Sequence, residues 1–168
     1  MKDGVKMINV YLFDWGDTLM VDFPDAVGKM YDWEVVEAVS GAKETLAALS
    51  KNAKIYIATG AADSTELEIQ QAFERVDLNQ FISGYFCKAN LGLSKGTPAF
   101  LNAILVQLNI SAAEVAMVGD NFEKDIKPAL SIGIQAFWFT QKTINTIPIS
   151  IPNKVNFIKQ LTELYANK

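Results

Sequence analysis

The chain has 168 residues, half of them apolar and one fifth charged, which predicts one domain, 1–168, with a well-buried core. A formal net charge of −4 gives no basic surface, so nucleic acid is not expected as the main partner. The sequence contains no histidine and a single cysteine, which excludes Ser-His-Asp and Cys-His catalysis, His-bearing or multi-Cys zinc sites and an internal disulfide.

The chemistry left to the chain is that of carboxylates, lysines, hydroxyls and backbone amides. Oxygen ligands of this kind suit a hard cation, and Mg²⁺ is the natural metal for them. The sequence shows no signal peptide and no apolar run long enough to cross a membrane. Because the lone Cys87 cannot form an internal disulfide, we expect a cytoplasmic protein without a membrane partner.

The first predicted element is a strand over residues 8–13, a near-continuous apolar run that stops at Asp14. Such runs are typical of buried parallel strands. A turn that contains Gly16 and Asp17 follows. Open α/β sheets bind their ligands at the carboxyl edge of the strands, so we expect Asp14 at the functional site.

Residues 20–36 contain Pro24, Gly28 and several aromatic side chains without a helical or alternating period. We interpret them as irregular structure or a small hairpin over the mouth of the site, forming a short flap or minimal cap. The alternative is an ordinary surface loop whose aromatic residues pack on the core.

Strands and helices alternate along the rest of the chain, which predicts a parallel sheet with right-handed crossover connections. Residues 63–66 have the pattern of a capping box, and Pro98 fits the first turn of a helix. The predicted helices cover 40–50 with Ser40 as N-cap, the segment after 63–66, 99–108, 124–132, and a final amphipathic helix with Val155, Ile158, Leu161 and Leu164 facing inward. Further strands are predicted at 54–58, 84–87, 115–118 and 134–139.

Side chains with useful chemistry follow several of these strands. Thr59 comes directly after the second strand, Asp120 closely follows the fourth, and Lys95 follows the third by a short loop. The carboxyl ends of parallel strands share one edge, so these groups are expected beside Asp14. Two acids, a hydroxyl and an ammonium suit a phosphoryl group bound through Mg²⁺, and a carboxylate can also attack phosphorus to form an aspartyl phosphate.

Four segments resemble, in the same order, the four motifs of the haloacid dehalogenase (HAD) superfamily: residues 14–19 (Asp-Trp-Gly-Asp-Thr-Leu), 59–60 (Thr-Gly), 95–98 (Lys-Gly-Thr-Pro) and 119–125 (Gly-Asp-Asn-Phe-Glu-Lys-Asp). The resemblance implies an α/β, Rossmann-like three-layer sandwich. Its five-stranded parallel sheet would have the order 3-2-1-4-5, with helices on both faces. No large cap domain is expected, because residues 19–40 are only long enough for a flap.

The resemblance also implies roles for the metal-site residues. Asp14 would be the nucleophile and a ligand of Mg²⁺, and Asp120 would supply a second carboxylate to the ion. Gly16 would bind the ion through its backbone carbonyl. Asp125 would brace the metal site from behind by pairing with Lys95. Taken alone, Asp125 is also explained as an acid that favours the first turn of a helix.

Thr59, the backbone amide of Gly60 and Lys95 would hold the phosphate. Phosphatases of this family usually carry an Asp at the position of Gly16, which protonates the leaving group and then activates water. Here the acid stands one place later, at Asp17, which is the candidate replacement. Loss of such proton transfer typically costs ~10²–10⁴-fold in rate, so we expect a slow hydrolase.

The resemblance therefore implies a Mg²⁺-dependent, phosphatase-like hydrolase of phosphomonoesters that acts through an aspartyl phosphate on Asp14. An open site favours a phosphorylated small molecule or a phosphorylated macromolecule as substrate, or a homo-oligomer in which a neighbouring subunit lends a lid. The alternative is a non-catalytic phosphate- or protein-binding module of the same fold. A receiver-type signalling domain is less well supported, because its phosphorylated Asp would follow the third strand, which here ends at Cys87-Lys88.

Overall fold

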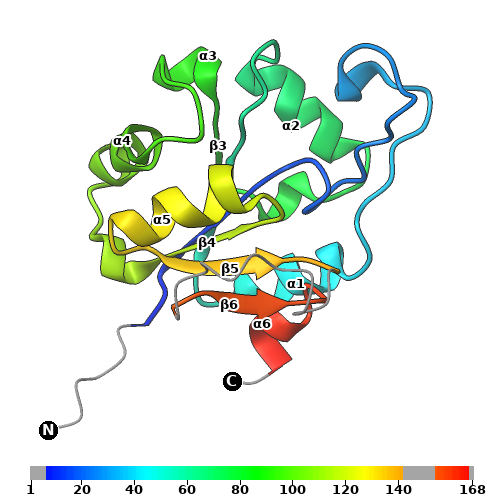
Figure 1. Cartoon of the computed structure of the whole chain (residues 1–168). Coiled ribbons are helices and arrows are strands. Elements are labelled where there is room, and N and C mark those ends of the chain that lie inside the picture. The colour runs from blue at the N-terminus through cyan, green and yellow to red at the C-terminus, as the bar shows by residue number, and fades with distance from the viewer. Residues whose placement is uncertain (1–6, 142–153, 167–168) are drawn as a thin grey trace, which may run out of the picture.

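The structure, a computed structural model, describes residues 7–141 and 154–166. Its centre is a parallel six-stranded sheet of order β3-β2-β1-β4-β5-β6 (Figure 1). The predicted α/β class and the order of the first five strands are confirmed, and a sixth strand extends the sheet beyond β5. The strands are β1 (Val10–Phe13), β2 (Lys54–Ala58), β3 (Gly84–Phe86), β4 (Val115–Gly119), β5 (Gln135–Phe139) and β6 (Asn156–Ile158).

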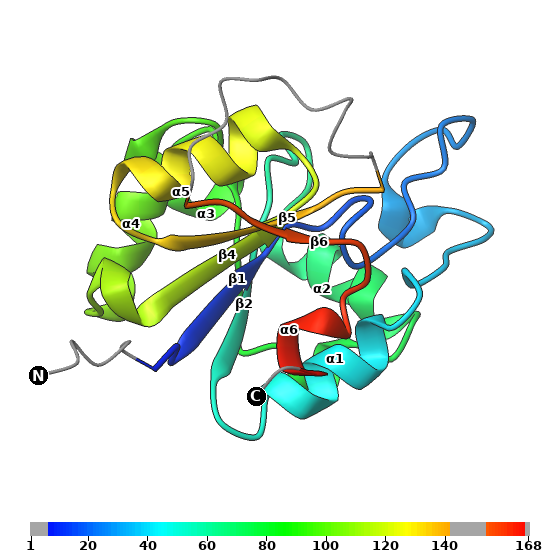
Figure 2. The ribbon, with the colours of Figure 1, turned by 60° about the horizontal axis from the view of Figure 1, so that its bottom comes forward.

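Helices cover both faces of the sheet (Figures 1 and 2). One face packs against α4 and α5, and the other packs against α1, α2 and α6. None of the helices in the described ranges is long and apolar enough to span a membrane. The helices are α1 (Ala42–Leu49), α2 (Glu66–Glu74), α3 (Lys88–Leu91), α4 (Pro98–Leu108), α5 (Lys127–Ser131) and α6 (Glu163–Ala166), with 3-10 turns η1 (Met30–Asp32), η2 (Asn79–Phe81) and η3 (Ala112–Glu114) and a π-helical turn η4 (Phe122–Ile126).

The central strand β1 explains why its sequence is apolar without interruption. Successive side chains of a strand point to opposite faces of the sheet. Val10 and Leu12 join the hydrophobic cluster under α4 and α5, whereas Tyr11 and Phe13 join the cluster under α1 and α2. All four side chains are buried. A strand covered on both faces therefore needs apolar residues at every position, and its last residue delivers Asp14 to the sheet edge.

The final helix predicted over residues 155–164 is wrong, because this segment forms β6 and then the short helix α6. The physical reason is the free edge of β5, with which β6 pairs in parallel; Thr140 donates its backbone amide to the carbonyl of Ile158 (3.0 Å). Val155 and Ile158 pack on opposite faces of the sheet, so they do not share one helical face. The loop that Pro148 and Pro152 predict over residues 141–153 lies, after Gln141, outside the described residues.

Two predicted helix starts are also corrected. Helix α1 begins after Gly41, which has a left-handed φ of 82° and provides no side-chain cap, so Ser40 is not the N-cap. The capping box predicted in residues 63–66 forms two positions later: Thr65 accepts from the amide of Glu68, and the Glu68 carboxylate accepts from the amide of Thr65.

Candidate active site

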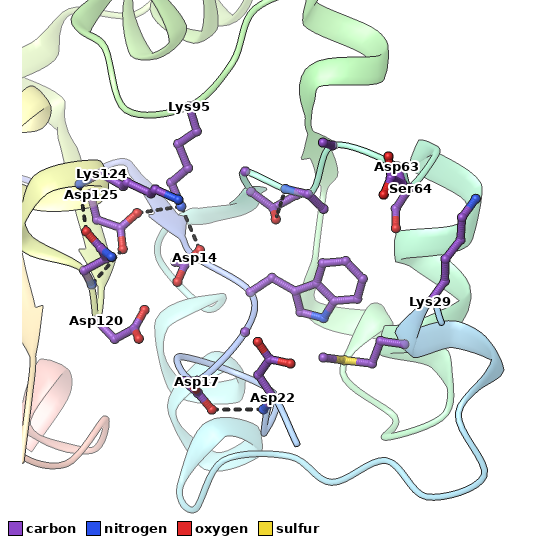
Figure 3. Close-up of a pocket in the computed structure, with 18 of the residues that line it drawn as sticks. Asp14, Asp17, Asp22, Lys29, Asp63, Ser64, Lys95, Asp120, Lys124 and Asp125 are labelled. Carbon is purple, nitrogen blue, oxygen red and sulfur yellow. Dashed lines mark hydrogen bonds and ion pairs between the residues drawn. The ribbon is translucent and has the colours of Figure 1, made fainter. Parts of the chain in front are cut away.

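The carboxyl ends of β1, β2 and β4 meet at one edge of the sheet. Asp14 follows β1, and its backbone amide donates to a carbonyl of β4 (2.9 Å), which fixes its position. Thr59 follows β2, Asp120 follows β4, and Lys95 lies on the loop between α3 and α4. Together with Asp125 these side chains line one pocket of about 670 Å³ (Figure 3).

Lys95 joins two of the acids. Its Nζ lies 2.7 Å from Oδ1 of Asp14 and 2.5 Å from Oδ1 of Asp125, so the structure forms the Lys95–Asp125 pair that the sequence motifs imply. Only 4% of the Lys95 side chain is exposed. Burial alone would lower the pKa of Lys95, but the charges of Asp14 and Asp125 raise it above its usual value. The ammonium is therefore held in its charged form at the bottom of the pocket.

Asp125 is positioned by η4 and by the end of β4. Its Oδ2 accepts the backbone amide of Asn121 (3.1 Å), and the side chain is buried. A Cβ on Gly119 would lie 2.2 Å from the same oxygen, so only glycine leaves room for this carboxylate. Burial, opposed by Lys95 and reinforced by the charge of Asp14, raises the pKa of Asp125 to about 6.

Thr18 connects the remaining two acids. Its hydroxyl lies 3.2 Å from Oδ2 of Asp14 and 3.4 Å from Oδ1 of Asp120, and the residue is fully buried. The indole of Trp138 donates to the backbone carbonyl of Asp120 (3.0 Å) and fixes that turn. The sequence motif contains Thr18, but nothing in its spacing revealed that the turn would fold this hydroxyl back onto two strand ends.

The acids influence one another's ionisation. Burial, a hydrogen bond to Asp14 and the charges of Asp14 and Asp125 raise the pKa of Asp120 to about 8. Burial would also raise the pKa of Asp14, but the charge of Lys95 and hydrogen bonds from Asp120 and Lys95 outweigh it and lower that pKa. Asp14 is therefore the ionised member of the Asp14–Asp120 pair.

A metal ion fits this group of acids. Oxygen atoms of Asp14, Asp120 and Asp125 all lie within 4.8 Å of one another. When all three carboxyl groups are ionised, they and the Lys95 ammonium leave a formal charge of −2, which a divalent cation would balance. Hard cations take oxygen ligands of this kind, and Gly16 also lines the pocket.

Thr59 and Gly60 complete the opposite wall. Thr59 is 4% exposed, and its hydroxyl accepts the backbone amide of Ala61 (3.1 Å), which forms a tight turn after β2. A Cβ on Gly60 would lie 3.5 Å from Cβ of Lys95, so the turn rests against the stem of that lysine. The structure thus brings the predicted phosphate-binding groups together beside Asp14.

The turn after Asp14 holds two further acids that line the pocket. Asp17 has a left-handed φ of 59°, and its Oδ1 accepts the backbone amide of Asp22 (2.9 Å). Figure 3 shows the Asp17 carboxylate turned toward that amide and the Asp22 carboxylate directed toward the side of the pocket where Asp14 lies. Burial and the charges of Asp17 and Asp14 raise the pKa of Asp22. The irregular sequence around Asp22 gave no signal for this placement.

The flap, residues 20–36, is fastened to α2. Lys29 of the flap forms an ion pair with Glu68 of α2, with 2.9 Å between Nζ and Oε2. Arg75 follows α2, and its guanidinium donates to three backbone carbonyls of the flap, those of Tyr31, Trp33 and Glu34. The flap contains one 3-10 turn, η1, and contributes Met30 and Trp33 to the pocket lining.

A parallel α/β sheet that presents acids, a lysine and a hydroxyl at the carboxyl ends of its strands defines a Rossmann-like protein with a ligand site at that edge. The family model of haloacid dehalogenase-like hydrolases matches residues 16–133, which is more than half of the chain. The chain therefore belongs to the haloacid dehalogenase-like hydrolases, as its motifs indicated. No curated protein sequence matches it significantly.

Solved structures share the fold over nearly the whole chain. An uncharacterized protein from Listeria monocytogenes serotype 4b is 21% identical, with a TM-score of 0.80 and 94% of each chain covered. A HAD phosphatase from Thermococcus onnurineus is 16% identical, with a TM-score of 0.74, 94% of this chain and 96% of that chain covered. A 2-haloacid dehalogenase from Pseudomonas syringae pv. Tomato is 17% identical, with a TM-score of 0.72 and the same coverage. At these identities the similarity establishes the fold.

Proposed function

We propose that the chain is a Mg²⁺-dependent phosphatase that hydrolyses phosphomonoesters through an aspartyl phosphate on Asp14. The observation that carries this proposal is the buried contact of 2.7 Å between Lys95 Nζ and the Asp14 carboxylate. Although burial would raise the pKa of Asp14, Lys95 lowers it, so the carboxylate is ionised at neutral pH. An ionised carboxylate at the bottom of a pocket is a competent nucleophile toward phosphorus.

The residues around Asp14 take separate parts in phosphoryl transfer. An oxygen of Asp14 bonds to phosphorus while the bond from phosphorus to the leaving oxygen breaks. The Lys95 ammonium, the Thr59 hydroxyl and the Gly60 amide, which all line the pocket, would bind the phosphate oxygens and stabilise their charge. Water then attacks the phosphorus of the aspartyl phosphate and releases Asp14.

Asp14, Asp120 and the backbone carbonyl of Gly16 would hold the metal ion, and Asp125 would brace them through Lys95. When bound, a divalent cation supplies positive charge that offsets the phosphate and the surrounding carboxylates. The all-oxygen donor set supports Mg²⁺ in particular, because this ion prefers carboxylates, carbonyls and water.

The substrate is proposed to be a phosphorylated small molecule or the phosphorylated part of a macromolecule. Two features support this breadth. The pocket, at about 670 Å³, is large enough for a metabolite, and the flap in front of it is a single irregular segment and not a cap domain. We also propose, as the alternative to an open pocket, a homo-oligomer in which a second copy of the chain covers the pocket.

The test is phosphate release from a panel of phosphomonoesters with and without Mg²⁺. We expect slow turnover that needs Mg²⁺ and falls to background in Asp14→Asn, whose amide cannot form an acyl phosphate. Hydroxylamine should trap the aspartyl phosphate in the wild type and not in the variant. Unchanged turnover in Asp14→Asn would refute the assignment of the nucleophile.

A second candidate is a non-catalytic phosphate- or protein-binding module of the same fold. The absence of a side chain at Gly16 favours it, because no acid stands at the position that usually protonates the leaving group. Metal-dependent binding of phosphate without turnover, and without trapping of a trigonal metal fluoride at Asp14, would support this candidate over the phosphatase.

A further inference from the structure

A leaving alkoxide needs a proton, and the chain has no histidine that could supply it. The pocket offers carboxyl, hydroxyl and ammonium groups instead. Four of them, Asp14, Asp120, Asp125 and Lys95, contact one another directly or through Thr18 and form the nucleophile and metal group. The proton donor is therefore to be sought among the other pocket residues.

Most of these residues are badly placed. Lys29 is paired with Glu68, and Figure 3 shows Lys29, Asp63 and Ser64 on the α2 side of the pocket, away from Asp14. Lys124 enters from the opposite side of the pocket to Asp22, and its side chain runs from beside Asp125 toward Lys95, the proposed phosphate-binding lysine (Figure 3). The Asp17 carboxylate is occupied by a backbone amide and turned away from Asp14.

Asp22 is placed differently. Its carboxylate points toward Asp14 and forms no hydrogen bond or ion pair with any residue in the described part of the chain. Its Oδ2 lies 3.4 Å from the point where a Cβ on Gly16 would stand. Residue 16 lacks a side chain, and the carboxylate of a residue six positions later fills the space beside it. A carboxyl group thus enters the pocket that Asp14 also lines.

We propose that Asp22 is the general acid and general base of this reaction, an inference that rests on the proposed phosphatase function. In the first step the electron pair of the breaking bond passes to the leaving oxygen, which takes the proton of the Asp22 carboxyl. In the second step a water oxygen bonds to phosphorus and its proton passes to the Asp22 carboxylate. The bond between phosphorus and Asp14 breaks, and its electron pair returns to Asp14.

The test compares leaving groups in Asp22→Asn, which keeps the shape of the side chain and removes its proton. For an alkyl phosphate such as glycerol 3-phosphate, we expect kcat/KM to fall by ~10²–10³-fold, because the alkoxide must be protonated as it leaves. For p-nitrophenyl phosphate, whose leaving group is stable as an anion, we expect kcat/KM to fall by less than about tenfold. Its kcat should still drop, with a burst of nitrophenol, because water activation is lost.

Two further variants keep the result interpretable. Asp25→Asn changes an exposed acid of the same flap that does not line the pocket, and both substrates should be hydrolysed at the wild-type rate. The double variant Gly16→Asp with Asp22→Ala moves the carboxyl to position 16. The three atoms nearest to a Cβ at Gly16 all belong to the Asp22 side chain, at 3.4 Å or more, and the backbone there is not left-handed, so a Cβ is tolerated at this position. We expect the double variant to recover about a tenth or more of the wild-type kcat/KM for the alkyl phosphate and to show no burst of nitrophenol.

Three results would overturn the role of Asp22. They are an equal fall in kcat/KM for both substrates in Asp22→Asn, no fall in that variant, and a fall in kcat/KM that depends on the leaving group in Asp17→Asn instead. In each of those cases the phosphatase function still holds if the wild type releases phosphate and Asp14→Asn does not. If the wild type releases no phosphate in the same assay, both the phosphatase function and the role of Asp22 are refuted. Thermal melts that match between wild type and Asp22→Asn show that folding is not the cause of a loss.

Discussion

At the scale of single residues, Gly119 and Asp125 form a matched pair. Asp125 packs its carboxylate against the last residue of β4, where even one methyl group at Gly119 would lie 2.2 Å from its Oδ2. Through this contact and the amide of Asn121 the acid is held where it can pair with Lys95. The position of Lys95, and through it the charge state of Asp14, therefore depends on an absent side chain.

We expect Gly119→Ala to destabilise the protein by ~1–3 kcal/mol, the usual effect of overpacking, and to reduce phosphatase activity. Urea unfolding measures the first effect and phosphate release the second. The double variant Gly119→Ala with Asp125→Gly removes all three atoms that clash, Oδ2, Cγ and Cβ of Asp125, so its free energy of unfolding should exceed the sum expected from the two single variants. Strict additivity of the two changes would show that the contact is not the cause.

The residues that the sequence identified are those whose place depends on strand ends alone. Asp14, Thr59 and Asp120 closely follow apolar runs, and the sheet order brings them together. The sequence did not identify Thr18 and Asp22 as site residues, because their positions depend on a chain reversal at Asp17. No local pattern predicts the left-handed φ of 59° at that residue. Their spatial neighbours are set by tertiary structure and not by spacing along the chain.

At the scale of elements, α2 does more than cover the sheet. The helix presents Ile69, Ala72 and Phe73 to the core, and the residues on its outer side hold the flap through the Lys29–Glu68 ion pair and through Arg75. The guanidinium of Arg75 donates to three backbone carbonyls of the flap, because its planar group carries several N–H donors that can bind several acceptors at once. The flap is thereby held in place although its only helical element is the 3-10 turn η1.

We expect Arg75→Gln to loosen the flap while leaving the core intact. Limited proteolysis should cut within residues 20–36 about tenfold faster, as expected for a segment that opens locally with a lower free energy. The matched control is Lys43→Gln, which breaks an exposed ion pair with Asp77 away from the flap and should leave the cleavage pattern unchanged. Equal cleavage rates in the two variants would contradict the role of Arg75.

The strands that are covered on both faces could be predicted from the sequence, whereas the strand at the edge of the sheet could not. The predicted strand at 134–139 and the β1 run formed at or close to their expected places, because each lies between covered faces. The segment 155–164 failed because its apolar residues recur about every third position, as on a helix, yet the open edge of β5 offered backbone partners. A strand at a sheet edge forms only if the neighbouring strand has unpaired backbone groups, and a local sequence pattern does not show whether it has.

At the scale of the whole molecule, two carboxyl groups of the site, those of Asp120 and Asp125, oppose folding as the pH rises. The pKa of Asp120 rises from its usual 3.8 to about 8, and that of Asp125 rises to about 6. A carboxyl group whose pKa is higher in the folded state binds its proton more tightly when folded. Its contribution to stability is present below pH 3.8 and is lost as the pH rises to about 8.

We therefore expect the Tm of the metal-free protein to fall between about pH 5 and about pH 8, and to fall less in Asp120→Asn, which has no proton to lose. Mg²⁺ at a fixed concentration of ~100 times its Kd at pH 8 should raise the free energy of unfolding by ~2.7 kcal/mol at that pH, and by less at pH 5, where Asp120 is protonated and the ion binds more weakly. Calorimetry with and without Mg²⁺ measures both effects. A Tm that is independent of pH and of Mg²⁺ would count against the metal site.

The fastened flap has a consequence for how substrates are selected. A segment anchored at several backbone atoms has little freedom to fold down over a bound molecule, so we expect the proposed reaction to need no cycle of opening and closing. In the proposed phosphatase, selection among substrates would then depend on the fixed outline of the entrance and on how far a phosphate must reach to meet Asp14.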